Sequence, residues 1–462
     1  GAGASFNRVQ GNFIGTDRAG QDHLLGNGAH GVLIDNAYRN LIGGTENVQG
    51  NVIARNQRNG VAVLGGDGDT NSILRNSMRS NAQLGIDLGD DGVTPNDPGD
   101  ADGGPNLRQN FPLITTATSD GAAVRVRGTL DSTPNGRFRL EFFATFVPDP
   151  SGHGEGDRFV GAGDVRTDAG GAATFDFSFP ATVQDGDQLT ATATRLASIE
   201  PSLPLEDTSE FSPRTSILPG LAGVFVAGSS WTRPFLDELA EKGLGDAAAG
   251  YRVGPARPGS VLLPWSNVDT VRFRFSRNVS VQQADLALAS GAGIPYAVSS
   301  FNYNPATYTA TWVFDRPLAD YPRLRRTADV LLLTLDGDGP DGVFSTDPFG
   351  SPRLDLDGGD FTQWLYAVPG DANRNASVSP TDYGTVRSGV GRSTTDEVVS
   401  PNHYTVFKDV NANGNVSPTD VGIVRGNTGA NVSDVPQPAA NPHDAAVSSI
   451  TSDLFATKSL LN

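Results

Sequence analysis

Two short stretches near the C-terminus carry oxygen-bearing side chains at the same spacing. One runs from Asp371 to Asp382 and the other from Asp409 to Asp420, so that equivalent residues lie 38 positions apart. In both, such side chains occupy loop positions 1, 3, 5, 9 and 12, position 7 can offer its backbone carbonyl, and position 8 is apolar. A hard cation such as Ca²⁺ takes six to eight oxygen ligands at about 2.3–2.6 Å. The repeat therefore predicts two cation-binding loops, each followed by a short helix.

The duplicated loop and helix resembles the type I dockerin family, whose loops bind Ca²⁺ and end in Asp rather than Glu. The resemblance covers residues 367–431 and implies a small α-helical domain with two Ca²⁺ sites in paired EF-hand-like loops. The ligands it implies in the first loop are Asp371, Asn373, Asn375, Ser377 through its carbonyl, Ser379 and Asp382. Those it implies in the second loop are Asp409, Asn411, Asn413, Asn415 through its carbonyl, Ser417 and Asp420.

The resemblance also implies a partner. Dockerins bind cohesin modules through loop positions 10 and 11 and the following helix, and these positions hold Pro380-Thr381 and Pro418-Thr419. Their identity in the two halves fits docking in either of two orientations. The alternative is a terminal module that caps the chain and has no such partner.

Two features of the loops are expected to weaken cation binding. Ala376 stands at position 6, where the family has a turn glycine, and a positive φ there costs a residue with a Cβ about 1 kcal/mol. Asn375 and Asn413 at position 5 leave only two carboxylates in each loop. We therefore expect dissociation constants of about 10⁻⁴–10⁻³ M, the range of extracellular modules. The competing interpretation is two Asx-rich turns that bind no metal.

The first 90 residues contain an irregular repeat of short β-branched runs between Asn/Gly turns. Its two elements are Gly-Asn-x-Ile and Gly followed by alternating aliphatic residues, and they recur at Gly11–Ile14, Gly50–Ile53, Gly31–Ile34, Gly60–Val63 and Gly85–Leu88. The spacing of 20–30 residues predicts stacked coils of a parallel β-solenoid. Asn at the turns fits, because Asn tolerates the left-handed conformation and stacked Asn side chains can hydrogen-bond along the stack.

Asn40–Thr45 and Leu84–Asp97 look like the last coils of right-handed parallel β-helix proteins, which occur in very large secreted bacterial surface proteins. In that family the chain commonly continues into a β-sandwich, here through Asn110–Pro112 with the motifs Arg139–Ala144 and Thr208–Ser212. The resemblance covers residues 1–213. It implies an extracellular or cell-surface location and a truncated β-helix with its closing loop over 1–111.

The middle of the chain predicts antiparallel strands. Alternating apolar residues separated by turn clusters indicate a β-sandwich over 112–217 and a second, Ig-like sandwich over 218–366. A helix is expected within the second, with Thr232 near its start, Pro234 in its first turn and Gly243 as its stop. The fold class is therefore mainly β, followed by the dockerin-like domain at 367–431 and a tail, 432–462, that we expect to be disordered.

Composition narrows the class of protein. At roughly 100–200 residues per domain, 462 residues predict three to five domains. The chain has 34 Lys and Arg against 52 Asp and Glu, and this net charge of −18 argues against nucleic acid as a partner. The absence of cysteine excludes disulfides and thiolate chemistry, so an extracellular chain needs another stabilising cross-link, such as bound Ca²⁺.

No apolar run is long enough to span a membrane as a helix. Since Gly1 falls inside a repeat, we expect a fragment or processed chain; the oligomeric state stays open.

Two further groups of acidic residues are candidates for metal binding. They are Asp87, Asp90, Asp91, Asp97, Asp100 and Asp102 in a loop that closes the solenoid, and Asp336, Asp338, Asp341, Asp355, Asp357 and Asp360 in the second sandwich. We interpret each as a solvated turn, because no single spacing directs five oxygens to one point.

No catalytic constellation stands out. Parallel β-helices host polysaccharide hydrolases and lyases, but those chemistries need paired carboxylates at a fixed separation, or Ca²⁺ with an Arg base. The acids of the coils do not recur at a common position, and the five histidines show no ligand or triad spacing. We therefore lean towards a protein that is not an enzyme.

Three functions remain at this point. The first is a non-catalytic, calcium-binding structural or assembly protein of the cell surface, attached through its dockerin-like module to a cohesin-like protein or a surface polysaccharide. The second is an accessory or truncated polysaccharide-degrading enzyme, a glycosyl hydrolase or lyase, tethered through the same module. The third is carbohydrate binding by one sandwich through exposed aromatic residues such as Trp265, Tyr303 or Trp364.

Overall fold

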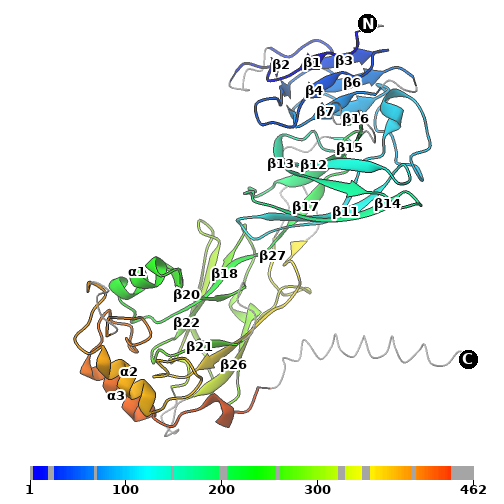
Figure 1. Ribbon diagram of the computed structural model, residues 1–462. Coiled ribbons are helices and arrows are strands. Elements are labelled where there is room, and N and C mark those ends of the chain that lie inside the picture. Colours follow the sequence, from blue (N-terminus) through cyan, green and yellow to red (C-terminus); the bar gives the residue numbers. More distant parts are fainter. Residues whose placement is uncertain are drawn as a thin grey trace, which may run out of the picture. The chain divides into compact units, whose positions relative to one another are not determined.

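A computed structural model of the chain describes residues 4–18, 25–66, 70–146, 150–196, 205–255, 260–320, 328–345, 354–396 and 402–438. Residues 439–462 of the tail predicted to be disordered lie outside this described part. Strands dominate, which confirms the prediction of a mainly β protein (Figure 1). The chain forms two compact units. The first comprises the described residues up to Gly220 together with Leu354, and the second begins at Leu221 and contains the other described residues.

Nine short strands at the start of the first unit pair in parallel. They form three three-stranded sheets: β1 (Arg8–Val9), β4 (Leu41–Gly43) and β7 (Ser72–Leu74); β2 (Phe13–Ile14), β5 (Val52–Ala54) and β8 (Ser77–Arg79); β3 (Val32–Asp35), β6 (Val61–Leu64) and β9 (Ile86–Leu88). Each sheet takes every third strand, so the chain winds in successive coils. Ile42 pairs with Ile73 and Ile53 with Met78, and these aliphatic side chains fill the interior of the coils.

Ladders of asparagine join the coils at their turns, as the repeat predicts. The backbone N–H and Nδ2 of Asn40 both donate to Oδ1 of Asn71, at 3.1 and 3.0 Å. The same pair of bonds joins Asn51 to Asn76 and Asn56 to Asn81. Because these side chains are buried, each bond satisfies polar groups that would otherwise be costly to remove from water.

Side chains from β12 and from two later loops complete the last coil. Oε2 of Glu141 accepts a hydrogen bond from the backbone N–H of Arg75 at 2.7 Å, and Oε1 of Glu155 accepts from the N–H and Nδ2 of Asn81. Oε1 of Glu210 accepts from the N–H of Leu88 at 2.9 Å. These buried carboxylates stand where a further coil would offer carbonyl and amide oxygens, and so they end the parallel stack.

The second half of the first unit is one nearly closed, barrel-like sheet. Its strands are β10 (Leu113–Ser119), β11 (Val124–Asp131), β12 (Arg137–Thr145), β13 (Arg158–Arg166), β14 (Ala172–Phe179), β15 (Gln188–Leu196), β16 (Leu205–Thr208) and β17 (Thr215–Pro219). They lie in the order β13-β12-β15-β17-β10-β11-β14, with β16 on β15. The alternating strand Thr174–Phe179 directs Phe175 and Phe179 onto Phe142 in the interior, at centroid distances of 5.5 Å.

The arrangement differs from the two separate antiparallel sheets of the expected sandwich. The first residues of β17 pair antiparallel with β15, whereas its last residues pair parallel with β10. This one short strand therefore connects the edges of what would be two sheets. Alternation along each strand reports which face is buried, but it carries no information on such long-range pairing.

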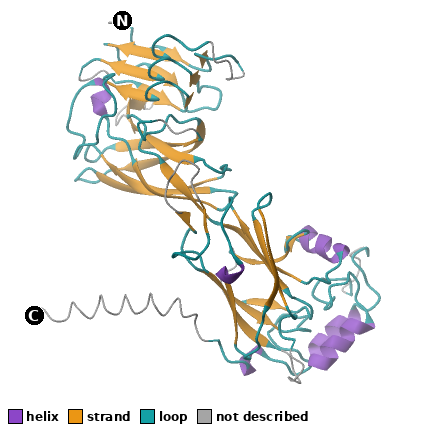
Figure 2. Cartoon of the chain, turned by 180° about the vertical axis from the view of Figure 1, so that it is seen from behind, coloured by secondary structure: helices purple, strands orange, loops and turns teal. Residues whose placement is uncertain are grey.

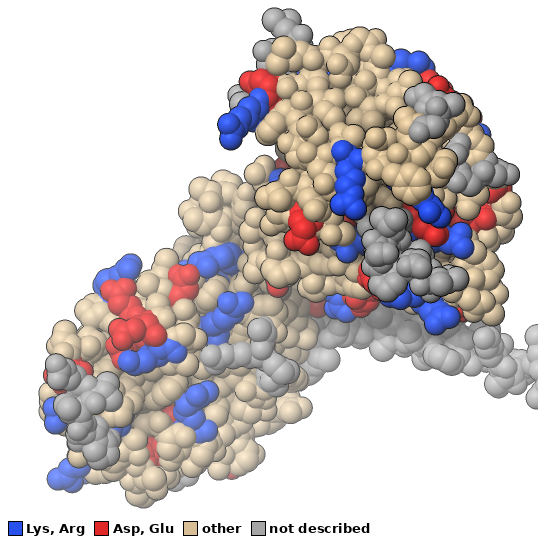
Figure 3. Space-filling model, turned by 45° about the horizontal axis from the view of Figure 1, so that its top comes forward, with Lys and Arg blue, Asp and Glu red and all other residues tan. Residues whose placement is uncertain are grey.

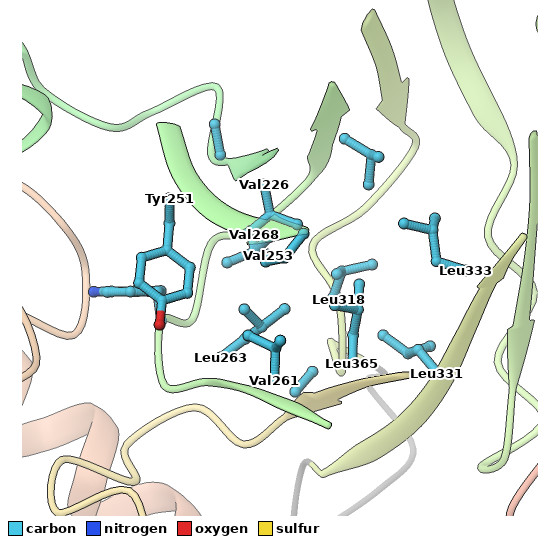
Figure 4. Packing of buried hydrophobic residues seen from close by; sticks show 14 of the residues in the cluster. Val226, Tyr251, Val253, Val261, Leu263, Val268, Leu318, Leu331, Leu333 and Leu365 are labelled. Atoms are coloured by element: carbon cyan, nitrogen blue, oxygen red, sulfur yellow. The ribbon is translucent and has the colours of Figure 1, made fainter. Parts of the chain in front are cut away.

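The second unit contains two sheets around a large apolar core. One has the order β19 (Gly245–Asp246), β20 (Gly250–Gly254), β18 (Leu221–Ala227), β22 (Thr270–Phe275), β25 (Thr309–Phe314), β24 (Val298–Asn304). The other has the order β21 (Val261–Leu263), β29 (Phe361–Ala367), β26 (Asp329–Leu335), β23 (Leu286–Ser290). Figure 4 shows Val226 and Val253 of the first sheet directed towards Leu331, Leu333 and Leu365 of the second. Two short strands, β27 (Phe344–Ser345) and β28 (Leu354–Asp355), lie outside these sheets.

The helices of the second unit follow their sequence signals. Helix α1 (Arg233–Glu241) begins after Thr232, buries Phe235 and Leu239, and ends before Gly243, whose φ is +64°. Helices α2 (Pro380–Ser388) and α3 (Pro418–Asn427) lie side by side (Figure 2). Short 3-10 turns cover Pro105–Arg108 (η1), Gln283–Asp285 (η2) and Val432–Asp434 (η3).

Trp265 lies inside this unit, so its assignment as an exposed carbohydrate-binding residue is wrong. It is 1% exposed, and its Nε1 donates to the carbonyl of Val406 at 2.9 Å. Its ring packs against Trp231, Tyr251 and Phe407. Tyr303 and Trp364 are half-buried. Trp265 thus joins the sheets to the segment after residue 402, and the apolar core of 218–366 continues into 367–431.

Candidate metal centre

The two C-terminal loops each lead into a helix through the same cap. In the first, Oγ of Ser379 accepts the N–H of Thr381 and donates to Oδ2 of Asp382, which also accepts the N–H of Ser379 at 2.9 Å. Ser417 and Asp420 make the same contacts at the start of α3. Positions 9 and 12 of each loop are therefore held together by a capping box.

The carboxylate at position 1 closes the turn in the same way in both loops. Oδ1 of Asp371 accepts the N–H of Asn375 at 3.0 Å, and Oδ2 accepts the N–H of Ala376 at 2.8 Å. Asp409 accepts the equivalent pair from Asn413 and Gly414, at 3.1 and 2.7 Å. Loops with different residues at positions 2, 4, 6 and 7 thus share one backbone path.

The carboxylate at position 12 reaches back to position 3. Oδ1 of Asp382 accepts the N–H of Asn373 at 3.0 Å, and Oδ1 of Asp420 accepts the N–H of Asn411 at 3.1 Å. The structure therefore places positions 1, 3, 9 and 12 around one turn in each loop.

The backbone carbonyl of the residue at position 7 faces the loop in both halves. Ser377 lies opposite Asn431 in an isolated antiparallel bridge whose hydrogen bonds come from the flanking residues, Ala376 and Val378. The N–H of Ser377 donates instead to Oδ1 of Asn375 within the loop. Asn415 has the equivalent placement opposite Ser393. In such a bridge the residue's own N–H and carbonyl face away from the partner strand, so both carbonyls remain on the loop side.

Burial makes a cation favourable between these carboxylates. Asp371 is 1% exposed, and Asp382, Asp409 and Asp420 are 0% exposed. Burial raises the pKa of Asp371, with a further contribution from the charge of Asp382, and raises that of Asp409 to about 6. Two buried negative groups repel each other, and a hard cation bound between them would offset both the repulsion and the desolvation.

The second loop has additional support that sequence spacing did not reveal. The hydroxyl of Tyr404 donates to Oδ2 of Asp409 at 2.8 Å. The carbonyls of three successive loop residues are held by residues next to α1 and β21: Ser266 N–H donates to Val410, Asn267 Nδ2 to Asn411 and Thr232 N–H to Ala412. These donors are about 140 to 180 positions away in the chain, and no local motif indicates them. The second loop is consequently the more preorganised of the two.

The first loop departs from the favourable geometry at position 6. Ala376 has φ of +69°, where the second loop has Gly414 with φ of +89°. We expect Ala376→Gly to stabilise the chain by about 1 kcal/mol and to strengthen Ca²⁺ binding at the first loop, because the Cβ is strained at positive φ. Calorimetric titration and denaturation would measure both effects. Gly414→Ala is the matched control and should weaken the second loop; equal affinities of the wild-type and Ala376→Gly chains would show that the strain does not reach the site.

Two further acidic groups converge although their spacing did not indicate it. Carboxylate oxygens of Asp97, Asp100 and Asp102 lie within 4.8 Å of one another, and so do those of Asp336, Asp338 and Asp360. In the second group the N–H of Gly337 donates to Oδ1 of Asp360 at 2.9 Å. The fold brings Asp360, on the turn before β29, beside the turn after β26, which a search for fixed spacing does not detect.

Two comparisons with known proteins gave no match. No protein-family model matches the sequence, and no curated protein matches it. Among the described residues, no helix is long and apolar enough to cross a membrane. On the face shown in Figure 3, basic and acidic side chains are interspersed.

Proposed function

We propose that this protein is a non-catalytic, calcium-stabilised structural or assembly protein of the bacterial cell surface. Its first strands form the end of a right-handed parallel β-helix, and 367–431 is a dockerin-like module that binds two Ca²⁺ ions. The observation that carries the proposal is the pair of C-terminal loops, which share one hydrogen-bonding pattern around two buried carboxylates each. The parallel pairing of β1–β9 and their asparagine ladders support the β-helix assignment.

The same module is the proposed attachment element. Pro380 and Thr381 are exposed at the start of α2, and Pro418 and Thr419 are exposed at the start of α3. The two helices therefore present matching residues, and the proposal is that either half can contact a cohesin-like partner. Ca²⁺ acts on this surface indirectly, because Asp382 and Asp420 lie in the first turns of the same helices.

Capture of the full chain on immobilised cohesin modules, with Ca²⁺ or with chelator, tests attachment. We expect retention in Ca²⁺ that chelator abolishes. Thr381→Arg or Thr419→Arg alone should retain binding, whereas the double variant should lose it, because each half suffices. Thr307→Arg, at an exposed turn between β24 and β25, is the control. The attachment role would be wrong if no cohesin retained the chain, or if retention were the same with chelator and with the double variant. Parallel capture on insoluble polysaccharide tests for a glycan partner.

A further inference from the structure

A second candidate cation site lies in the first unit, in the loop between β9 and η1. Carboxylate oxygens of Asp97, Asp100 and Asp102 lie within 4.8 Å of one another. Two oxygens bound to one Ca²⁺ at about 2.3–2.6 Å can be no more than about 5 Å apart. The separations of the three carboxylates therefore fall within the range that one shared ion requires.

The loop is held in this shape by buried neighbours. The N–H of Asn110 donates to Oδ1 of Asp100 at 2.8 Å, and its Oδ1 accepts the N–H of Asp97 at 3.0 Å. Oγ of Ser132 donates to Oδ2 of Asp100 at 2.7 Å. Asn110 and Ser132 are 1% and 0% exposed, so the loop is anchored to the barrel-like sheet. Preorganised oxygen ligands favour a cation because little freedom is lost on binding.

Buried oxygens that lack donors give an independent indication of a cation. Among the residues that the structure describes, Oδ1 of Asp102 and both carboxylate oxygens of Asp207 are buried without a hydrogen-bond partner. Asp207 is 1% exposed. Its pKa is raised to about 7, chiefly by burial and also by the negative charges of Glu206 and Asp100, which outweigh the opposing effect of Arg195. A carboxylate in such a position is costly unless it is protonated or compensated by positive charge.

Asp207 interacts with the acidic loop, since the negative charge of Asp100 contributes to its raised pKa. Asp207 belongs to β16, and the carbonyl of the next residue, Thr208, accepts a hydrogen bond from Nδ2 of Asn106 in η1. The turn η1 follows Asp102 after two glycines. The nearby cation Arg108 forms an ion pair with Asp91, at 3.2 Å, and its charge only partly offsets the raised pKa of Asp102. Carboxylates from two segments of the chain, the acidic loop and β16, thus interact although they lie more than 100 positions apart.

We propose that Asp97, Asp100 and Asp102 bind one Ca²⁺, with Asp207 adding negative charge beside them, and that this ion fastens the closing loop of the coils to the barrel-like sheet. The site is separate from the C-terminal loops and does not depend on their assignment. Its role is structural: it replaces, in a chain without cysteine, the covalent staple that would hold such a loop.

Hydrogen–deuterium exchange of the full chain, read on peptides covering 97–111, tests the proposal locally. We expect 10 mM Ca²⁺ to slow exchange there by about tenfold or more relative to chelator, since an ion that binds only the closed loop suppresses its opening. Asp97→Asn with Asp102→Asn should abolish this protection, and Asp102→Asn alone should reduce it. Asp164→Asn, at an exposed acid on β13 of the same unit, is the control and should retain it.

The experiment separates this site from the C-terminal loops. A chain carrying Asp409→Asn and Asp420→Asn should keep Ca²⁺ protection of 97–111, and the Asp97/Asp102 variant should keep that of 405–425. If the wild-type chain shows no Ca²⁺-dependent protection of 97–111, or if the Asp97/Asp102 variant retains it, the proposal is wrong. Equal protection by Mg²⁺ at the same concentration would contradict the assignment to Ca²⁺.

Discussion

Trp265→Ala is expected to lower the free energy of unfolding of the second unit by about 3–5 kcal/mol, the range for removing a large buried aromatic side chain. Trp265 is 1% exposed and packs between Tyr251 of β20 and Phe407 near the second metal loop. Removing the ring would leave a cavity between the sheets and the C-terminal segment, and would also leave the carbonyl of Val406 without its donor. The effect should therefore extend to the loop that begins at Asp409.

Denaturation followed by tryptophan fluorescence measures this change in the second unit alone, because all four tryptophans, Trp231, Trp265, Trp312 and Trp364, lie after residue 220. Trp364→Ala is the matched control, and its half-buried side chain should cost much less. Trp265→Phe keeps most of the volume but not the Nε1 donor, so a cost of about 1–3 kcal/mol isolates the hydrogen bond. A change below about 1 kcal/mol in Trp265→Ala would contradict the shared core.

Removing Ca²⁺ is expected to destabilise the second unit by a comparable amount. With dissociation constants of about 10⁻⁴–10⁻³ M, 10 mM Ca²⁺ adds about 1.4–2.7 kcal/mol for each occupied loop. Two loops therefore contribute about 3–5 kcal/mol. Asp409→Asn with Asp420→Asn should remove the share of the second loop, because these two buried carboxylates are its only negative ligands. Denaturation in Ca²⁺ and in chelator measures the difference.

The variant chain also has an informative behaviour without metal. Burial raises the pKa of Asp409 in the metal-free loop, so the negative charge of this side chain is unfavourable there. Replacing it by the neutral Asn should therefore cost less stability in chelator than in Ca²⁺. Asp434→Asn, an exposed acid in η3, serves as the control and should keep the full response to Ca²⁺. An equal loss of stability in Ca²⁺ and in chelator would mean that the two carboxylates act through the turn alone.

Features set by local spacing could be predicted from the sequence. The short helices after the two loops, the start of α1 after Thr232 and the asparagine ladder through Asn40 and Asn71 depend on residues a few positions apart or on a repeat. In each case the chemistry of one short segment determines its conformation. The oxygen-rich loops belong to the same class, since the contacts at their positions 1, 9 and 12 join residues of one short segment.

Features that depend on distant segments were not predictable in this way. The strand β17 joins two sheet edges, Tyr404 supports Asp409, and the surroundings of Trp265 include residues on both sides of a long stretch of chain. The acidic loop at Asp97 shows the same limit, because Asp207, whose raised pKa reflects the charge of Asp100, lies more than 100 positions further along the chain. Aromatic residues are a poor guide to exposure, since they bury the largest apolar area when a core is available.

Calorimetric titration of Ca²⁺ into the chain that carries Asp97→Asn and Asp102→Asn tests the central claim most directly, because it leaves the C-terminal loops as the proposed binding sites. The account predicts two ions per chain at millimolar Ca²⁺, and one ion when Asp409→Asn and Asp420→Asn are added. The account would be contradicted if the chain with Asp97→Asn and Asp102→Asn gave only the heat of dilution while its tryptophan fluorescence showed a folded second unit.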